Sequence, residues 1–342
     1  MTGRSRMAAG QIGDTPVAHD VEATTAEFAA DVRRALAGHP RRQLSSRYFY
    51  DPLGSALFDA ICRLPWYRIT RAETGLLTRY GAEILAALEP LGRVIELGAG
   101  SGEKLAVLLS ARPPGAARLP VHLVDVSRAA LNSAARTLGA LGNVEVVAHQ
   151  SRFLTWLETA GRPRRAEPAP GGRALAMFLG SNIGNFEPPA ADALLARIRA
   201  MLQPGDAFLL GADLVKPEHD LRLAYDDPLG VTAAFNRNLL VRINRELGGE
   251  IDVGSFRHHV VWNREASRIE MYLVSTRAQR VRIAAADVDV SLEEGDAIWT
   301  ESSHKYEAGD VVRMLERCGF ARRAQWLDGQ AGFALTLVGV TV

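Results

Sequence analysis

The sequence predicts an α/β protein built on a doubly wound parallel sheet, with a second domain of helices and antiparallel strands. Three features predict this fold class. A short apolar strand, a glycine turn and a helix follow one another over residues 94–109. Strand and helix patterns then alternate as far as residue 210, which is typical of a parallel sheet covered on both faces. After Asp213 a long helical stretch leads into segments that alternate like antiparallel strands.

Composition and charge limit the classes of function. The chain has 342 residues, 47% of them hydrophobic, which suits one large or two modest domains. A formal net charge of +1 gives no electrostatic reason to expect nucleic acid or an anionic membrane as a partner. The two cysteines do not make a disulfide framework, and no apolar run is long enough to span a bilayer. We expect a cytoplasmic monomer with a flexible leader over residues 1–20.

Three helices are predicted before the glycine turn. Hydrophobic residues at helical spacing predict one over residues 21–37 and a second over residues 57–64. A third is expected to begin at Thr70, with Glu73 three residues further on completing a capping box. The turns before the second and third helices carry tyrosines, whose hydroxyls can point into a cleft.

The rest of the chain divides into a core and an inserted segment. Core strands are expected at residues 94–97, 121–124, 144–148, 174–179, 207–210, 324–327 and 333–340. The inserted segment is expected to hold a helix at 221–247 and strands at 256–262, 268–275 and 279–283. A segment rich in proline, glycine and arginine is expected to be a surface loop, at 161–173. The expected domains are a core of residues 72–215 and 306–342 and a substrate-binding domain of residues 21–71 and 216–305.

The glycine turn is the candidate cofactor site. Glycine at Gly98, Gly100 and Gly102 lets a ligand approach the backbone, and the helix behind it presents free N–H groups. A dinucleotide-binding turn would need a small residue where Glu103 stands. The spacing G-x-G-x-G after the acid Glu96 resembles the class I S-adenosylmethionine (SAM) methyltransferases, whose Rossmann-like core is a doubly wound sheet. A glycine-rich connection without a ligand is the alternative.

Two charged residues lie at the same predicted edge of the sheet. Asp125 closes the second strand, where an acid binds ribose hydroxyls in nucleotide folds; capping the next helix is its alternative role. Lys104 lies in the first turn of its helix, where the dipole does not favour a cation. We expect it to bind a carboxylate such as that of SAM, with a surface lysine as the alternative. His258 and His259 face opposite ways along a strand, so we expect no metal site.

Several longer motifs identify a family. They are RYFYD (47–51), LPWYRITR (64–71), ELGAG (96–100), LGSNIGNF (179–186), AYDDPLGVTAAFNRN (224–238), RIEM (268–271) and TESSHK (300–305). In this order they resemble the histidine Nα-methyltransferases of ergothioneine biosynthesis, which make trimethylhistidine (hercynine). The likeness runs from about residue 25 to the C-terminus. It implies a class I methyltransferase core, a substrate-binding domain, SAM as methyl donor and a small amino acid as substrate.

The resemblance also implies roles for single residues. Residues at cofactor-binding positions are Glu96, Gly98, Gly100, Lys104, Asp125 and Phe153, the last as an aromatic wall for the adenine. Residues expected to hold the amine and carboxylate of the amino acid are Tyr67, Asn185 and Tyr225, with Tyr50 near the amine. Residues expected to recognise the imidazole are Glu301 and Ser303, beside Met271. Asn185 and Tyr50 are the candidate catalytic residues, because they can orient the amine.

The expected chemistry suits these residue types. Glu301 and Ser303 are two apart, so they share one face of an extended segment and can accept from and donate to the two imidazole nitrogens. Methyl transfer needs a neutral amine aligned with the S–CH₃ bond, which makes positioning the main contribution. The family's usual acid near the adenine is replaced here by the sequence Gln150-Ser151-Arg152. Two alternatives therefore stay open, an N-methyltransferase for another amino acid or aromatic amine and a non-catalytic binding protein.

Overall fold

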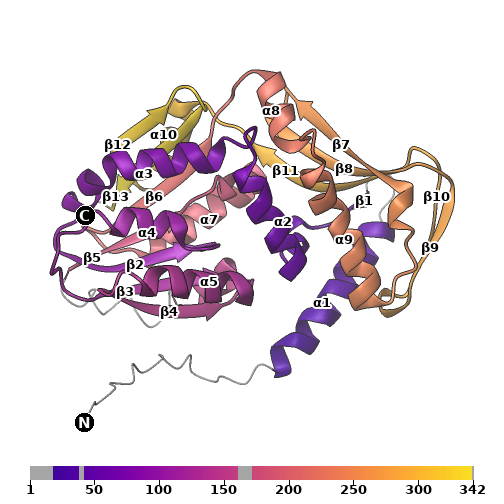
Figure 1. Ribbon diagram of the computed structural model, residues 1–342, viewed down its shortest axis with the longest axis horizontal. Coiled ribbons are helices and arrows are strands. Elements are labelled where there is room, and N and C mark those ends of the chain that lie inside the picture. Colours follow the sequence, from indigo (N-terminus) through magenta and orange to yellow (C-terminus); the bar gives the residue numbers. More distant parts are fainter. Residues whose placement is uncertain (1–17, 38–41, 161–171, 341–342) are drawn as a thin grey trace, which may run out of the picture.

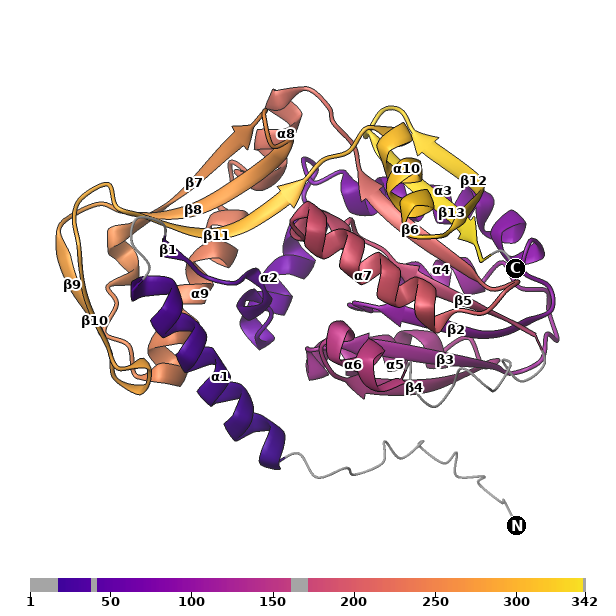
Figure 2. The same ribbon diagram turned by 180° about the vertical axis from the view of Figure 1, so that it is seen from behind.

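The computed structural model describes residues 18–37, 42–160 and 172–340 of the chain. The first 17 residues of the expected leader and nearly all of the expected loop at 161–173 lie outside these ranges. Figures 1 and 2 show two parts side by side, one around a large sheet and one around a smaller sheet. No helix among the described residues is long and apolar enough to cross a membrane.

The large sheet has the strand order β12-β13-β6-β5-β2-β3-β4. Its strands are β2 (Leu91–Leu97), β3 (Leu119–Asp125), β4 (Val144–Gln150), β5 (Arg173–Phe178), β6 (Ala207–Asp213), β12 (Ala321–Asp328) and β13 (Phe333–Gly339). Neighbours from β6 to β4 pair in parallel, whereas β13 is antiparallel to both β6 and β12. The sheet is therefore mixed rather than wholly parallel, because β12 and β13 form a hairpin.

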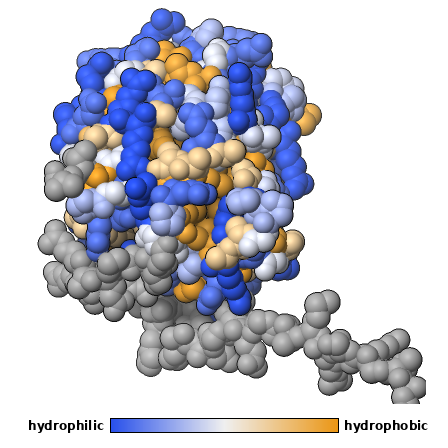
Figure 3. Space-filling view, turned by 90° about the vertical axis from the view of Figure 1, so that its left-hand side faces the viewer, coloured by the Kyte–Doolittle hydropathy of each residue, from blue (hydrophilic) through white to orange (hydrophobic). Residues whose placement is uncertain are grey.

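Helices cover both faces of this sheet. On one face lie α3 (Ile69–Ala86), α4 (Glu103–Leu109) and α5 (Arg128–Gly139); on the other lie α6 (Phe153–Ala160), α7 (Pro188–Met201) and α10 (Ala308–Arg317). Each face of the sheet packs against its helices in a separate hydrophobic core. Neighbouring residues of one strand point into opposite cores, as Val94 and Ile95 of β2 do. This arrangement confirms the predicted doubly wound α/β core. At the end of the core away from the smaller sheet, hydrophilic residues surround an apolar area (Figure 3).

The smaller part holds the antiparallel strands predicted after Asp213. One sheet has the order β1-β11-β8-β7, and a separate hairpin joins β9 and β10. The strands are β1 (Arg42–Gln43), β7 (Phe256–Asn263), β8 (Arg268–Ser275), β9 (Gln279–Ile283), β10 (Val288–Leu292) and β11 (Ala297–His304). The helices are α1 (Ala18–Ala37), α2 (Pro52–Arg63), α8 (Glu218–Tyr225) and α9 (Val231–Leu247). Short 3₁₀ turns lie at Ser46–Phe49, Asn182–Asn185 (η3), Val253–Ser255 and Ala284–Ala286.

The prediction of one helix over residues 221–247 is wrong, because the helix is interrupted between α8 and α9. The Asp227 carboxylate accepts hydrogen bonds from the backbone N–H groups of Leu229, Val231 and Thr232, at 2.8–3.1 Å. Gly230 has a φ of +72°, a left-handed conformation that glycine adopts without strain. This turn changes the direction of the chain, so that α8 and α9 pack against the smaller sheet as two separate helices.

The predicted capping box at Thr70 and Glu73 is also wrong. The helix α3 begins at Ile69, and its N-cap residue Arg68 makes no side-chain capping bond. Glu73 is fully buried, at 0% exposure, and accepts hydrogen bonds from the backbone N–H of Gly180. The S/T-x-x-E pattern therefore marks no capping box here, and Glu73 is instead a buried carboxylate that joins α3 to the turn after β5.

Candidate active site

A cavity lies where the turn after the carboxyl end of β5 approaches the smaller sheet. Its empty space is about 480 Å³, open solvent at the mouth included. Its lining includes every residue that sequence analysis assigned to the substrate: Tyr50, Tyr67, Asn185, Tyr225, Met271, Glu301 and Ser303. These seven residues come from six separate segments of the chain. The structure brings the set together, while the role of each residue in binding stays a prediction.

Aromatic rings form the wall of the cavity on the side of α2. Tyr50 makes edge contacts with Phe58 and Phe235, with ring centroids 5.6 and 5.8 Å apart. Tyr67 makes an edge contact with Tyr225 at 6.2 Å. Burial raises the pKa of all three tyrosines, so each hydroxyl stays protonated near neutral pH. The wall is therefore apolar with neutral hydrogen-bonding groups.

The strand β11 carries Glu301 and Ser303. The β11–β8 pairing shifts register between Trp299 and Glu301, an irregularity that re-aims the following side chains. Both residues line the cavity, as their spacing on one strand face predicts. Burial raises the pKa of Glu301 to about 7, and the nearby Lys305 opposes this rise. Glu301 is thus half ionised close to neutral pH.

The turn η3 brings Asn185 to β11. It follows β5, and Ser181 before it adopts a left-handed φ of +58° while its Oγ accepts from the backbone N–H of Asp213. Gly184 lies directly against β11: a Cβ added there would be 2.8 Å from the carbonyl oxygen of His304. The position of Asn185 near Glu301 and Ser303 therefore requires a residue without a side chain at position 184.

We expect Gly184→Ala to separate η3 from β11. The added methyl group meets backbone rather than a flexible side chain, so the variant should lose about 1–3 kcal/mol of stability. It should also show a higher KM for histidine, the substrate that the resemblance implies. Urea unfolding and steady-state assays check this. Gly75→Ala in α3 is the matched control, since an added Cβ there has no neighbour within 4 Å. Equal behaviour of the two variants contradicts the packing account.

The glycine turn has the geometry that a bound cofactor needs. Gly98, Gly100 and Gly102 have φ values of +73°, +53° and +75°, all in the left-handed region. A Cβ at Gly98 would be 3.1 Å from Asn182 Nδ2, and one at Gly102 only 2.9 Å from Ala134 of α5. The first two glycines thus keep the turn open to a ligand, and the third lets α4 and α5 pack closely.

Asp125 organises this turn from the end of β3. Its carboxylate accepts from the backbone N–H of Gly100 at 3.1 Å and of Ser127 at 2.8 Å. Ser127 Oγ caps α5 by accepting from the backbone N–H of Ala130. The alternative prediction, that Asp125 is the residue that caps this helix, is therefore wrong. Burial raises the pKa of Asp125. Ribose binding by Asp125 stays a prediction.

Lys104 binds a carboxylate of the protein itself. Its Nζ lies 2.5 Å from Oε2 of the buried Glu73. Burial lowers the pKa of Lys104, but Glu73 more than offsets this, so the ammonium stays charged. Glu96 lies nearby, and burial raises its pKa to about 8 despite the charge of Lys104. The sequence pattern predicted that Lys104 binds the carboxylate of SAM. It gave no indication of Glu73 as the partner, because the one signal at Glu73 suggested a helix cap.

Phe153 joins an aromatic cluster at the carboxyl end of β5. Its ring contacts Phe178 and Phe186, with centroids 5.4 and 5.9 Å apart. Gln150 and Ser151 are the side chains expected to replace the missing acid. Gln150 Nε2 donates to the carbonyl oxygen of Val126, and Ser151 Oγ donates to that of Arg152. The Gln150 amide oxygen and the Ser151 hydroxyl can each still accept a hydrogen bond. The roles of both residues and of Phe153 at the adenine stay predictions.

Comparison with known proteins shows which family the chain belongs to. A family model described as "Histidine-specific methyltransferase, SAM-dependent" matches residues 28–340. The chain belongs to this family. Histidine N-alpha-methyltransferases of Mycolicibacterium smegmatis and Mycobacterium tuberculosis are 40% identical over 308 and 309 residues, covering 90% of this chain and 93% of each relative. The N-methyltransferase fsqC of Aspergillus fumigatus is 28% identical over 305 residues, covering 87% of this chain and 80% of its own length.

Family membership confirms several predictions made from the motifs. The chain is a SAM-dependent histidine methyltransferase, and its mixed seven-strand sheet is the class I methyltransferase core. SAM, which supplies the methyl group, fits the observed turn, because the left-handed Gly98 and Gly100 leave the backbone accessible.

Proposed function

We propose that this chain transfers three methyl groups from SAM to the α-amine of L-histidine, giving hercynine. The observation that carries the proposal is the pair Glu301 and Ser303 on β11, both of which line the cavity. Asn182, which also lines it, lies next to Gly98 of the glycine turn. A carboxylate and a hydroxyl at this spacing match the two nitrogens of a neutral imidazole. Met271 packs beside them as an apolar neighbour for the ring.

The other end of the cavity suits the amino-acid backbone. Tyr67, Asn185 and Tyr225 offer neutral donors and acceptors to the amine and the carboxylate of histidine. Among the described residues that line the cavity, Glu301 is the sole carboxylate, and we assign it to the imidazole. The amine therefore loses its proton to solvent, and Asn185 and Tyr50 hold its lone pair toward the methyl donor.

Binding measurements test this assignment directly. Histidine and its Nα-monomethyl and Nα,Nα-dimethyl derivatives should bind to protein saturated with S-adenosylhomocysteine, because the cavity must accept each intermediate. Tryptophan should bind at least about 100-fold more weakly, since it leaves the Glu301 and Ser303 groups unpaired. Calorimetry checks both. Tighter binding of tryptophan than of histidine would refute the imidazole assignment.

The pKa of Glu301 predicts how histidine binding depends on pH. With a pKa of about 7, the Glu301 carboxylate is ionised above pH 7 and protonated below it, so the acceptor for the imidazole N–H is lost as pH falls. Histidine affinity should drop by roughly 10-fold between pH 8 and pH 6. Glu301→Gln removes this titration, so the histidine affinity of the variant should fall less between pH 8 and pH 6 than that of the wild type. A wild-type profile identical in shape to that of Glu301→Gln would show that Glu301 is not the group that titrates.

A further inference from the structure

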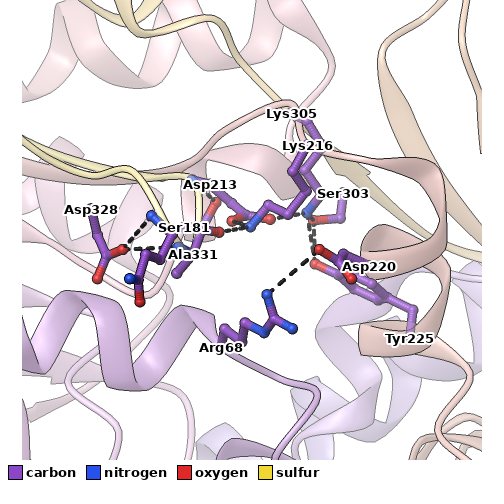
Figure 4. A network of polar contacts seen from close by, with 11 residues as sticks. Arg68, Ser181, Asp213, Lys216, Asp220, Tyr225, Ser303, Lys305, Asp328 and Ala331 are labelled. Carbon is purple, nitrogen blue, oxygen red and sulfur yellow. Dashed lines mark hydrogen bonds and ion pairs between the residues drawn. The ribbon is translucent and has the colours of Figure 1, made fainter.

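A buried lysine behind the cavity binds two of the hydroxyls that line it. Lys305 follows β11, and its side chain is 0% exposed. Its Nζ donates to Tyr225 Oη and to Ser303 Oγ, each at 2.8 Å, and lies 3.0 Å from Asp213 Oδ2 (Figure 4). An ammonium group has three N–H donors, so each one here has its own partner. No donor of Lys305 is left for a substrate.

The hydrogen bonds of Lys305 determine where the two hydroxyl protons go. The oxygens of Tyr225 and Ser303 are 2.8 Å apart, so one hydroxyl donates to the other. Both also accept from Lys305, which occupies their buried side. The two hydroxyls have two protons and use one between them. The remaining proton is therefore available to an acceptor in the cavity, which both side chains line.

Asp213 holds Lys305 in this place. Its side chain is 2% exposed, and its second oxygen pairs with Lys216, which also donates to the carbonyl oxygen of Ala331 (Figure 4). Burial lowers the pKa of Lys305, but Tyr225 and Asp213 outweigh this, so Lys305 stays charged. Asp213 and the two hydroxyls therefore take all three donors of Lys305, which fixes the ammonium on the buried side of Tyr225 and Ser303.

We propose that Lys305 is a positioning residue for the amino-acid substrate: anchored by Asp213, it orients the hydroxyls of Tyr225 and Ser303 so that they donate to histidine. The proposal rests on the proposed function. When histidine enters, the bond between the two hydroxyls can open, and each can donate to the ligand while it still accepts from Lys305. Without the lysine, a hydroxyl proton can turn back toward Asp213, and the substrate loses a donor.

The test compares two lysines that share Asp213. Lys305→Met removes the donor to both hydroxyls, whereas the matched control Lys216→Met removes an ammonium that touches neither. Loss of oriented donors should raise the KM for histidine by roughly 10-fold or more in Lys305→Met. The affinity for S-adenosylhomocysteine should stay within about two-fold, and Lys216→Met should keep the histidine KM within about two-fold.

A double-mutant cycle separates positioning from a general structural role. In the Tyr225→Phe/Ser303→Ala background no hydroxyl remains to be oriented, so Lys305→Met should add less than about three-fold. The same factor in both backgrounds, an equal loss of S-adenosylhomocysteine affinity, or an unchanged histidine KM would overturn the proposal. If Lys305→Met fails to fold, the double variant Lys305→Met/Asp213→Asn is tested by the same criteria, because it removes one positive and one negative charge and so leaves the net charge unchanged. Failure of the wild type to methylate histidine would instead refute the proposed function.

Discussion

Glu301→Ala should weaken histidine binding by about 50-fold, because a hydrogen bond to a charged group contributes roughly 1.5–3 kcal/mol. The substitution removes the acceptor for the imidazole N–H and leaves the glycine turn untouched, since Glu301 lies on β11 in the smaller sheet. The affinity for S-adenosylhomocysteine should therefore stay within about two-fold of the wild type. Calorimetry with each ligand measures both quantities on one protein preparation.

The variant Glu301→Gln is the matched control for this result. Glutamine keeps the shape and one acceptor oxygen but not the charge, so its loss of histidine affinity should be smaller than that of alanine. Equal losses of histidine and S-adenosylhomocysteine affinity in Glu301→Ala would contradict imidazole recognition, because they would point to a collapsed site. The same would follow if tryptophan lost affinity as strongly as histidine.

Gly98→Val should abolish SAM binding. Gly98 has a φ of +73°, which a β-branched residue adopts only with strain, and an added Cβ would be 3.1 Å from Asn182 Nδ2. The side chain would also stand on the backbone that the cofactor must approach. We expect no detectable binding of S-adenosylhomocysteine by calorimetry and a loss of product of at least about 1,000-fold.

Gly142→Val separates the block of the cofactor from backbone strain. Gly142 has the same φ of +73°, but no atom lies within 4 Å of an added Cβ, and it lies in the connection between α5 and β4. This control should show a similar loss of stability with normal SAM binding. If both variants lose SAM binding to the same extent, strain alone explains the effect, and the assignment of the turn to SAM fails.

The sequence predicted the core and the members of the cavity because both have local signatures. Strand and helix periodicities mark the sheet, and the motifs around Tyr67, Asn185, Tyr225 and Glu301 are long enough to identify a family. Their convergence depends on contacts that no local pattern encodes. The clearest is the approach of Gly184 to the backbone of β11, which joins residues far apart in the chain.

The sequence did not predict the buried ion pairs of the protein. Glu73 sits at the spacing of a helix cap, and Asp213 and Lys305 are ordinary charged residues at the ends of strands. Only the fold shows that Glu73 binds Lys104 and that Asp213 binds Lys305. Burying a charge is costly unless it is paired, and the partner of each lies in another segment. Pairing of this kind therefore needs the three-dimensional structure.

The most direct test of the account is competition among amines for one methyl donor. The protein is incubated with SAM and an equimolar mixture of histidine, tryptophan, tyrosine and histamine, and the products are followed by mass spectrometry. We predict mono-, di- and trimethylated histidine in succession, with trimethylhistidine as the end product and S-adenosylhomocysteine formed in a three-to-one ratio to it. Faster methylation of another amine, or binding of SAM and histidine without any methylated product, would contradict the account.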